Sequence, residues 1–274
     1  MKLINIINEK KQIAVNNNLE EEAIDFLIKN YFFTSNTDYY LALNEEFSKK
    51  EELDSIINRY LIDRIPPQYI LGYTYFLGLE INVNNNVLIP RRETEEVTLK
   101  AIELINNNKF NKVLDLCTGS GCIAISIKKM TKAMVTASDI SEKALEVAKK
   151  NGIINNVTIE YIQSDLFENI TDKYDLIISN PPYLSIDDYN SASNIVTNNE
   201  PKNALLAEDN GLYFYKLIID NALNYLKGEK YLVFEIGDNE LDSIVSYAKS
   251  KYEDIYFEAI NDMQGKARIL VFKF

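Results

Sequence analysis

The first 65 residues carry apolar side chains at helical spacing and contain neither glycine nor proline. Intervals of three and four residues place apolar side chains on one face of a helix. The clearest such set is Leu53, Ile56, Ile57, Tyr60 and Leu61. This pattern predicts a small bundle of three or four helices, at about residues 2–16, 19–31, 37–48 and 50–64.

Pro66 and Pro67 follow this region and are expected to end the bundle, because neither residue can continue a helix. The next segment, QYILGYTYFLGLEINVNNNVLI at 68–89, is rich in aromatic and β-branched residues. It predicts a β-hairpin or two short strands that bridge two domains. The Tyr and Phe side chains at 69–76 are expected to belong to an interdomain core rather than to a stacking platform.

The hydrophobic pattern changes at about residue 88, where short apolar runs begin to alternate with helical segments. The predicted strands are 112–116, 133–139, 158–165, 174–180 and 231–237. Such alternation is typical of parallel strands joined by crossover helices, which is a doubly wound α/β sheet. Residues 255–260 and 267–274 are separated only by a turn, which predicts an antiparallel hairpin at the end of the sheet. The expected domains are a bundle at 1–65, a linker at 66–90 and an α/β domain at 91–274.

Composition narrows the function classes. The 274 residues are 26% charged and 46% hydrophobic, as in a globular protein, with a net charge of −12. A surface of that charge repels phosphate backbones, so we expect no direct nucleic-acid binding and no binding to anionic membranes. The chain has no histidine, which excludes catalytic triads and metal sites that need one.

The two cysteines, Cys117 and Cys122, lie in one short segment, so no disulfide framework is expected. They need be no more than small residues in a tight loop and helix. The start of the chain is broken by charges, and no apolar stretch is long enough for a membrane span. Together these observations predict a cytoplasmic protein in a reducing compartment.

The first chemical motif follows the strand at 112–116 and reads Asp115-Leu116-Cys117-Thr118-Gly119-Ser120-Gly121. Glycines at a strand-to-helix turn allow the backbone to approach a ligand closely. Asp139 ends the next predicted strand, 20 residues after Gly119, where a carboxylate can accept both ribose hydroxyls. The pair favours a nucleoside cofactor over the alternative of a plain turn and a helix cap.

The second motif, Asn180-Pro181-Pro182-Tyr183, follows the strand at 174–180. In a doubly wound sheet the first and fourth strands flank the switch point, so this motif should face the glycine loop. The Asn180 side-chain oxygen and the Pro181 carbonyl can accept two N–H bonds from a planar NH₂ group, and Tyr183 offers a flat face. The alternative is an ordinary Asn-Pro turn.

Other residues near these motifs have open roles. Arg91 and Arg92 can bind an anionic group, although surface ion pairs with Glu93, Glu95 or Glu96 are the simpler expectation. Thr94 is expected to be a helix N-cap. Asp165 either orients an adenine amine or is structural, and Glu235 is either a ligand contact or a buried, hydrogen-bonded carboxyl.

Asn-Pro-Pro-Tyr resembles the signature of amino-group methyltransferases that use S-adenosylmethionine. Further segments are similar, in order and spacing, to the peptide chain release factor glutamine methyltransferases (the HemK/PrmC family). These segments are residues 68–97, DLCTGSGCIAISIK, SDLF, EPKNALLAEDNGLYFYKLI and FEIGDNE. The resemblance covers nearly the whole chain and implies a Rossmann-like class I methyltransferase sheet behind an all-α bundle that recognises the substrate.

The resemblance implies methylation of the side-chain amide nitrogen of glutamine in the Gly-Gly-Gln loop of release factors, by an enzyme expected to be a monomer. It assigns S-adenosylmethionine to Cys117, Thr118, Gly119, Ser120, Gly121, Asp139, Leu166 and Asn180. It assigns the glutamine to Asn180, Pro181, Pro182 and Tyr183, of which Asn180, Pro181 and Tyr183 are the expected catalytic residues.

The chain departs from the family pattern at two positions. Arg92 stands where the family usually has proline. Cys117 replaces a frequent glycine, so its backbone is expected to avoid a glycine-only conformation. Two other functions remain as alternatives: a nucleic-acid adenine or guanine amino methyltransferase, which would need a basic surface, and a binding module, which would have a degenerate Asn180–Tyr183 motif.

Overall fold

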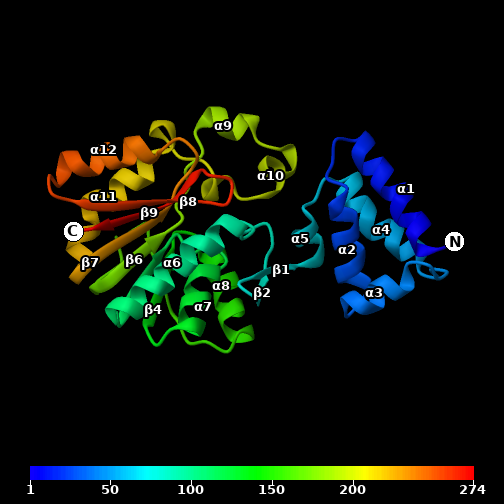
Figure 1. Ribbon diagram of the computed structural model, residues 1–274, viewed down its shortest axis with the longest axis horizontal. Coiled ribbons are helices and arrows are strands. Elements are labelled where there is room, and N and C mark those ends of the chain that lie inside the picture. The colour runs from blue at the N-terminus through cyan, green and yellow to red at the C-terminus, as the bar shows by residue number, and fades with distance from the viewer. The chain divides into compact units, whose positions relative to one another are not determined.

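The computed structural model describes residues 1–274 and divides into two compact units. The first unit contains Met1–Tyr73 and Ser193–Asn199, and the second contains Thr74–Ala192 and Glu200–Phe274. The chain therefore contributes to the first unit twice, the second time through a short segment that follows the Asn180–Tyr183 motif. Figure 1 shows the elements, coloured along the chain.

The first unit is all-helical. Its helices are α1 (Leu3–Asn16), α2 (Glu22–Phe32), α3 (Asn36–Ala42), α4 (Lys50–Leu61), α5 (Pro67–Leu71) and α10 (Asn194–Asn199). The predicted face of α4 is confirmed, since Leu53, Ile57, Tyr60 and Leu61 are buried in the core of this unit. Burial of such an amphipathic face provides most of the stability of a short helix.

Two expectations for this unit are wrong. Pro66 and Pro67 do not end the helices: residues 67–71 form α5, because Pro67 occupies the first turn of a helix, where a missing N–H is not a loss. Gly72, at φ +84°, then ends that helix. The two short strands predicted within residues 68–89 do form, after this helix, at 73–76 and 79–82. The third helix stops at Ala42, well before the expected residue 48.

Helix α10 was not expected from the sequence. Ile195 packs against the apolar core of the first unit, and the Asn199 side-chain NH₂ donates to the Arg64 carbonyl at 2.9 Å. One apolar side chain and one hydrogen bond thus tie this segment to the bundle.

The second unit contains a seven-stranded sheet, and the predicted doubly wound α/β class is confirmed. The strands are β3 (Lys112–Leu116), β4 (Met134–Asp139), β5 (Glu160–Gln163), β6 (Tyr174–Ser179), β7 (Leu226–Glu235), β8 (Tyr256–Asn261) and β9 (Ala267–Lys273). Their order is β5-β4-β3-β6-β7-β9-β8. The first five are parallel, and β9 pairs antiparallel with both β7 and β8, as the closing hairpin predicted.

Helices cover both faces of the sheet, as Figure 1 shows: α6 (Arg92–Asn108), α7 (Cys122–Met130) and α8 (Glu142–Ile154) lie on one face, and α11 (Tyr213–Tyr225) and α12 (Leu241–Lys251) on the other. A two-stranded sheet of β1 (Tyr73–Phe76) and β2 (Leu79–Asn82) precedes them. The short elements after β6 are α9 (Ile186–Ser191), η1 (Lys202–Ala204) and η2 (Asp209–Gly211).

The sheet places the two chemical motifs together. Strands β3 and β6 are neighbours, and their register pairs Leu116 with Ser179. The segments that begin at Cys117 and Asn180 therefore leave the sheet side by side, at the switch point of the strand order, where ligands bind in this class of fold. No helix in the structure is long and apolar enough to cross a bilayer.

Candidate active site

Two glycines in the loop between β3 and α7 have left-handed backbone conformations. Gly119 has φ +54°, and a Cβ built there would meet nothing within 4 Å, so the loop leaves space beside it. Gly121 has φ +81°, and a Cβ there would lie 3.0 Å from the Ala148 Cβ. Gly119 thus allows close approach of a ligand, whereas Gly121 allows close packing of α8.

Cys117 also has a left-handed backbone, with φ +60°. This region favours glycine but is open to other residues, so it does not contradict the expectation that Cys117 avoids a glycine-only conformation. A side chain is tolerated in this region at some cost when the surroundings hold it there. Burial raises the pKa of the Cys117 thiol, and that of Cys122 to about 12, so both cysteines remain neutral thiols near pH 7.

Asp115, near the end of β3, stabilises the loop through hydrogen bonds. Its Oδ2 accepts from the Thr118 hydroxyl at 2.6 Å and from the Ala124 N–H at 3.1 Å, so it joins the loop to the first turn of α7. Burial raises its pKa to about 7. The sequence did not predict this role, although an acid before a glycine loop is the signal for it.

Asp139 joins the loop to the end of β4. Its Oδ2 accepts from the Gly119 N–H and its Oδ1 from the Ser141 N–H, both at 2.9 Å. Ser141 itself caps α8, since its hydroxyl accepts from the Ala144 N–H. The cap of α8 is therefore Ser141 and not Asp139, which was the alternative role considered for Asp139. An ionised carboxylate has about four acceptor sites, so Asp139 keeps acceptors beyond these two bonds.

One cavity brings most of the predicted residues together. Of those assigned from the sequence, Cys117, Thr118, Gly119, Ser120, Asp139, Leu166, Asn180 and Pro182 line it, as do Arg91, Thr94 and Asp165. Gly121, Pro181 and Tyr183 do not line it. Tyr183 instead borders a second cavity together with Glu240 and Arg268.

The Asn180–Tyr183 loop is packed closely. Pro181 and Pro182 are buried. A Cβ on Gly211 would lie 2.3 Å from the Tyr183 carbonyl oxygen, so only glycine fits at 211. The Leu184 N–H donates to the Leu205 carbonyl at 2.8 Å, which ties the end of the loop to the segment after η1. These contacts fix the position of the loop relative to the cavity.

The residues with open roles now have partners. Thr94 is not a helix N-cap: it lies inside the first turn of α6, and its hydroxyl donates to Glu235 Oε2 at 2.6 Å. Arg91 does not pair with the neighbouring glutamates but with Glu200, with an Nη2–Oε1 distance of 2.5 Å. Glu235 is buried with a hydrogen-bond donor, which was one of the two alternatives for it.

Comparisons with known proteins agree with this geometry. Residues 94–209 match the model of the methyltransferase small domain family. The chain is 36% identical to the release factor glutamine methyltransferase of Lactococcus lactis over 91% of this chain and 93% of that protein. It is 34% identical to the one of Streptococcus pneumoniae over 99% of this chain and 98% of that protein.

Solved structures show the same fold at lower sequence identity. A methyltransferase from Pyrococcus furiosus has a TM-score of 0.53 at 17% identity, covering 82% of this chain and 98% of that one. A Thermus thermophilus 16S rRNA N2 G1207 methyltransferase in complex with AdoMet and guanosine has a TM-score of 0.53 at 14% identity, covering 73% of this chain and 49% of that one.

The sheet order, the glycine loop and the cavity beside Asn180 define a methyltransferase of the doubly wound class. Within that class, the chain belongs to the release factor glutamine methyltransferase family. It is an enzyme, and no group of three or more acidic or cysteine side chains in it is placed to hold a metal ion.

Proposed function

We propose that this enzyme transfers a methyl group from S-adenosylmethionine to the side-chain amide nitrogen of the glutamine in the Gly-Gly-Gln motif of peptide chain release factors. The observation that carries the proposal is that a single cavity is lined by both the glycine loop and Asn180. The names of the relatives, over nearly the whole length of both chains, support the choice of glutamine.

The residues of the cavity fit the cofactor. The open space beside Gly119 suits a ligand in contact with the loop backbone, and the Asp139 carboxylate has acceptor sites for the ribose hydroxyls. Leu166 and Asp165, on the same wall, are the residues we assign to the adenine. The bound sulfonium would supply an electrophilic methyl group.

Asn180 is the residue that we assign to the reacting amide. Its Oδ1 accepts one N–H of the glutamine carboxamide, and we assign the second N–H to the Pro181 carbonyl. An amide nitrogen is a weak nucleophile because its lone pair is delocalised into the carbonyl. Hydrogen-bond acceptors placed to favour a pyramidal nitrogen reduce this delocalisation as the N–C bond forms. Asn180 therefore stabilises the transition state more than the bound substrate.

Holding the two reactants in a fixed geometry provides much of the remaining rate enhancement, since it can lower a barrier by about 7–11 kcal/mol.

In the transfer, the S–C bond breaks, the N–C bond forms, and the nitrogen loses one proton. The nitrogen is positively charged once it has taken the methyl group, and an amide in that cationic form is acidic enough to release the proton to water, so no histidine is needed. We assign substrate recognition to the helices of residues 1–65 and expect the enzyme to act in the cytoplasm as a monomer.

The proposal is tested by incubating the enzyme with a release factor and S-adenosylmethionine labelled in its methyl group, then locating the label by mass spectrometry. We expect label on the glutamine of Gly-Gly-Gln and none on a release factor in which that glutamine is replaced by alanine. Label on RNA or DNA, with none on the glutamine, would favour the nucleic-acid methyltransferase instead.

A further inference from the structure

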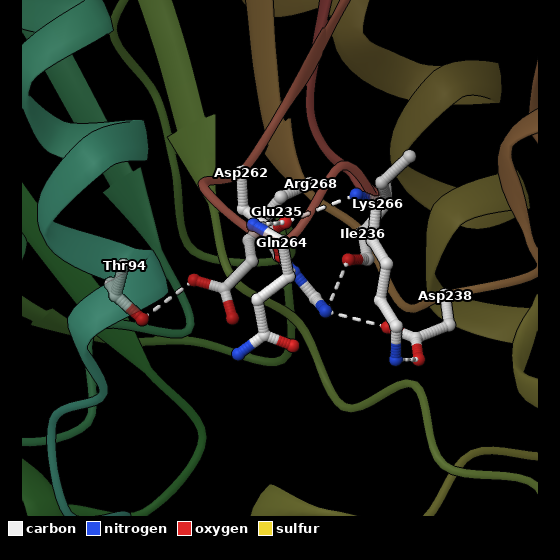
Figure 2. Close-up of polar contacts among 8 residues, drawn as sticks. All are labelled: Thr94, Glu235, Ile236, Asp238, Asp262, Gln264, Lys266 and Arg268. Carbon is white, nitrogen blue, oxygen red and sulfur yellow. Dashed lines mark hydrogen bonds and ion pairs between the residues drawn. The ribbon is translucent and has the colours of Figure 1, made fainter.

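Thr94 and Glu235 form a buried polar pair behind Asn180. Figure 2 shows the Thr94 side chain on α6 pointing toward the Glu235 carboxylate at the end of β7. The Thr94 hydroxyl donates to Glu235 Oε2 at 2.6 Å, and the Asn180 Nδ2 donates to Thr94 Oγ1 at 3.4 Å. Thr94 is 3% exposed and Glu235 is 2% exposed, so water does not compete for these bonds.

The chemistry of the three groups sets the direction of each bond. An ionised carboxylate only accepts, so Glu235 takes the single proton of the Thr94 hydroxyl. The Thr94 oxygen is then left with lone pairs and can only accept. It therefore binds the NH₂ end of the Asn180 amide and not the carbonyl end. The consequence is that the Asn180 carbonyl oxygen is the end left for the cavity.

If the Asn180 amide were inverted, so that its NH₂ and oxygen exchanged places, it could not accept an N–H from the substrate. Two NH₂ groups would then face each other. The two orientations of an amide have almost the same shape, so packing alone does not choose between them. The choice needs a neighbour with a defined donor or acceptor character.

Arg268 does not replace Thr94 as the partner of Glu235. Figure 2 shows that its guanidinium donates to the Ile236 carbonyl and to Asp238, at 2.9 and 2.6 Å. The charge of Arg268 still acts on Glu235 from a distance and lowers its pKa, as do the hydrogen bonds from Thr94 and Asn180. On this side the Asn180 NH₂ therefore faces two acceptors, the Thr94 oxygen at 3.4 Å and the Glu235 carboxylate.

We propose that Thr94 and Glu235 are positioning residues that hold the Asn180 amide with its oxygen toward the substrate. This inference rests on the proposed function, since it assumes that Asn180 accepts an N–H of the reacting group. Neither residue touches the reacting atoms in this arrangement: Thr94 acts through Asn180, and Glu235 acts on Asn180 both through Thr94 and through its own hydrogen bond from the Asn180 side chain.

The first test is Thr94→Val, which keeps the side-chain shape and removes the hydroxyl. One hydrogen bond to a buried charged group contributes about 1.5–3 kcal/mol, so we expect kcat to fall about 10- to 150-fold. The KM for release factor and the affinity for S-adenosylmethionine should change less than about threefold. The lost interaction is one that stabilises the transition state and not the bound substrate. Thr94→Ser retains the hydroxyl and should restore most of the rate.

Thr98→Val is the matched control. Thr98 lies one turn further along α6 and is fully buried, but its hydroxyl donates at 2.7 Å to the backbone carbonyl of Thr94 in the same helix and not to a side chain. We expect a stability loss similar to that of Thr94→Val and a normal kcat. Equal loss of kcat in the two variants would show a structural role and overturn the inference.

A second variant keeps the inference testable if Thr94→Val does not fold. Burial raises the pKa of Glu235 to about 7. A protonated Glu235 can donate to Thr94, which frees the Thr94 proton and permits the inverted Asn180. The wild-type rate should therefore fall as the pH is lowered through about 7, and Glu235→Gln should be slow without this pH dependence.

The other titratable and charged groups around Glu235 are Arg268 on β9, Glu93 on α6, Tyr183 after β6, Tyr215 on α11 and Cys122 on α7. Burial raises the pKa of Tyr183, Tyr215 and Cys122, and Arg268 stays charged, so none of these four titrates in the same range. A pH profile unchanged by Glu235→Gln, or normal kcat in Thr94→Val, would overturn the inference. Failure of the wild type to label glutamine would instead overturn the proposed function.

Discussion

At the scale of single residues, Asp139 serves two neighbours at once. It accepts from the N–H groups of Gly119 and Ser141 and faces the cavity, while burial raises its pKa. Asp139→Ala should therefore remove the ribose acceptors and also loosen the glycine loop. A charged hydrogen bond is worth about 1.5–3 kcal/mol, so we expect cofactor affinity, measured by calorimetry, to fall about 10- to 150-fold.

Asp139→Asn is the matched variant, because it retains one acceptor oxygen and the size of the side chain. It should lose less affinity than Asp139→Ala. Unchanged affinity in a folded Asp139→Ala would show that the carboxylate only holds the loop, and the cofactor assignment at this residue would then be wrong.

Single-residue roles were predictable where they follow from a local motif. Gly119, Asp139 and Asn180 lie at strand ends, and the strand order brings those ends together, so their shared cavity follows from the pattern. Thr94 is different, because its partner Glu235 is 141 residues away. Only the tertiary structure shows that its hydroxyl is used across the sheet rather than at the start of its own helix.

At the scale of elements, the central parallel strands β3 and β6 were predictable because each is a short apolar run buried on both faces. Predicted strands 112–116 and 174–180 match β3 and β6 within one residue. Helices α5 and α10 were not predictable. Each has fewer than eight residues, too few for a helical period to show, and tertiary contacts such as that of Ile195 stabilise them.

Glu200 connects two segments at the rim of the cavity. Its buried carboxylate accepts from the Ile89 N–H at 3.1 Å and from Arg91, and Arg91 and Pro201 both line the cavity. Glu200→Gln removes the charge and one acceptor, at a cost of about 1 kcal/mol or more. We expect cofactor affinity to fall about fivefold, as measured by calorimetry.

Glu208→Gln is the control for this change, because Glu208 is exposed in the same segment. It should bind the cofactor normally. If Glu200→Gln and Glu208→Gln bind the cofactor equally well, the ion pair does not shape the cavity.

At the scale of the whole molecule, the absence of histidine makes the pH dependence of stability simple to interpret. Burial raises the pKa of Asp115, Glu235 and Glu240 to about 7. The folded state therefore binds more protons than the unfolded state between pH 4 and about 7, and stability decreases as the pH rises through this range. Asp115 and Glu235, which are fully buried, should each cost about 1 kcal/mol between pH 6 and pH 8, and the partly exposed Glu240 should cost less.

We accordingly expect a higher midpoint of thermal unfolding at pH 6 than at pH 8, measured by calorimetry. Asp115→Asn removes one of the three groups and should flatten this dependence. A midpoint that rises with pH would contradict the assignment of raised pKa values to these buried carboxyls.

The division of roles between the two units is also testable. Removing residues 1–65 should leave cofactor binding measurable and lower release-factor methylation sharply, since the cavity is lined only by residues of the second unit. Because Ile195 packs against the core of the first unit, the truncated protein should also carry Ile195→Ser. Full methylation by the truncated, folded protein would assign substrate recognition to the second unit instead.

The most direct test of the central claim is single-turnover methyl transfer to the Gly-Gly-Gln glutamine by Asn180→Ala, measured beside its affinity for S-adenosylmethionine. Loss of one preorganised hydrogen-bonding group at a reacting centre typically lowers the rate about 10²- to 10³-fold. We predict a loss of that size with a much smaller change in cofactor affinity, since the contact with the reacting amide forms only with the substrate. Transfer at a near-normal rate by the folded variant would contradict the assignment of Asn180 to the reacting amide.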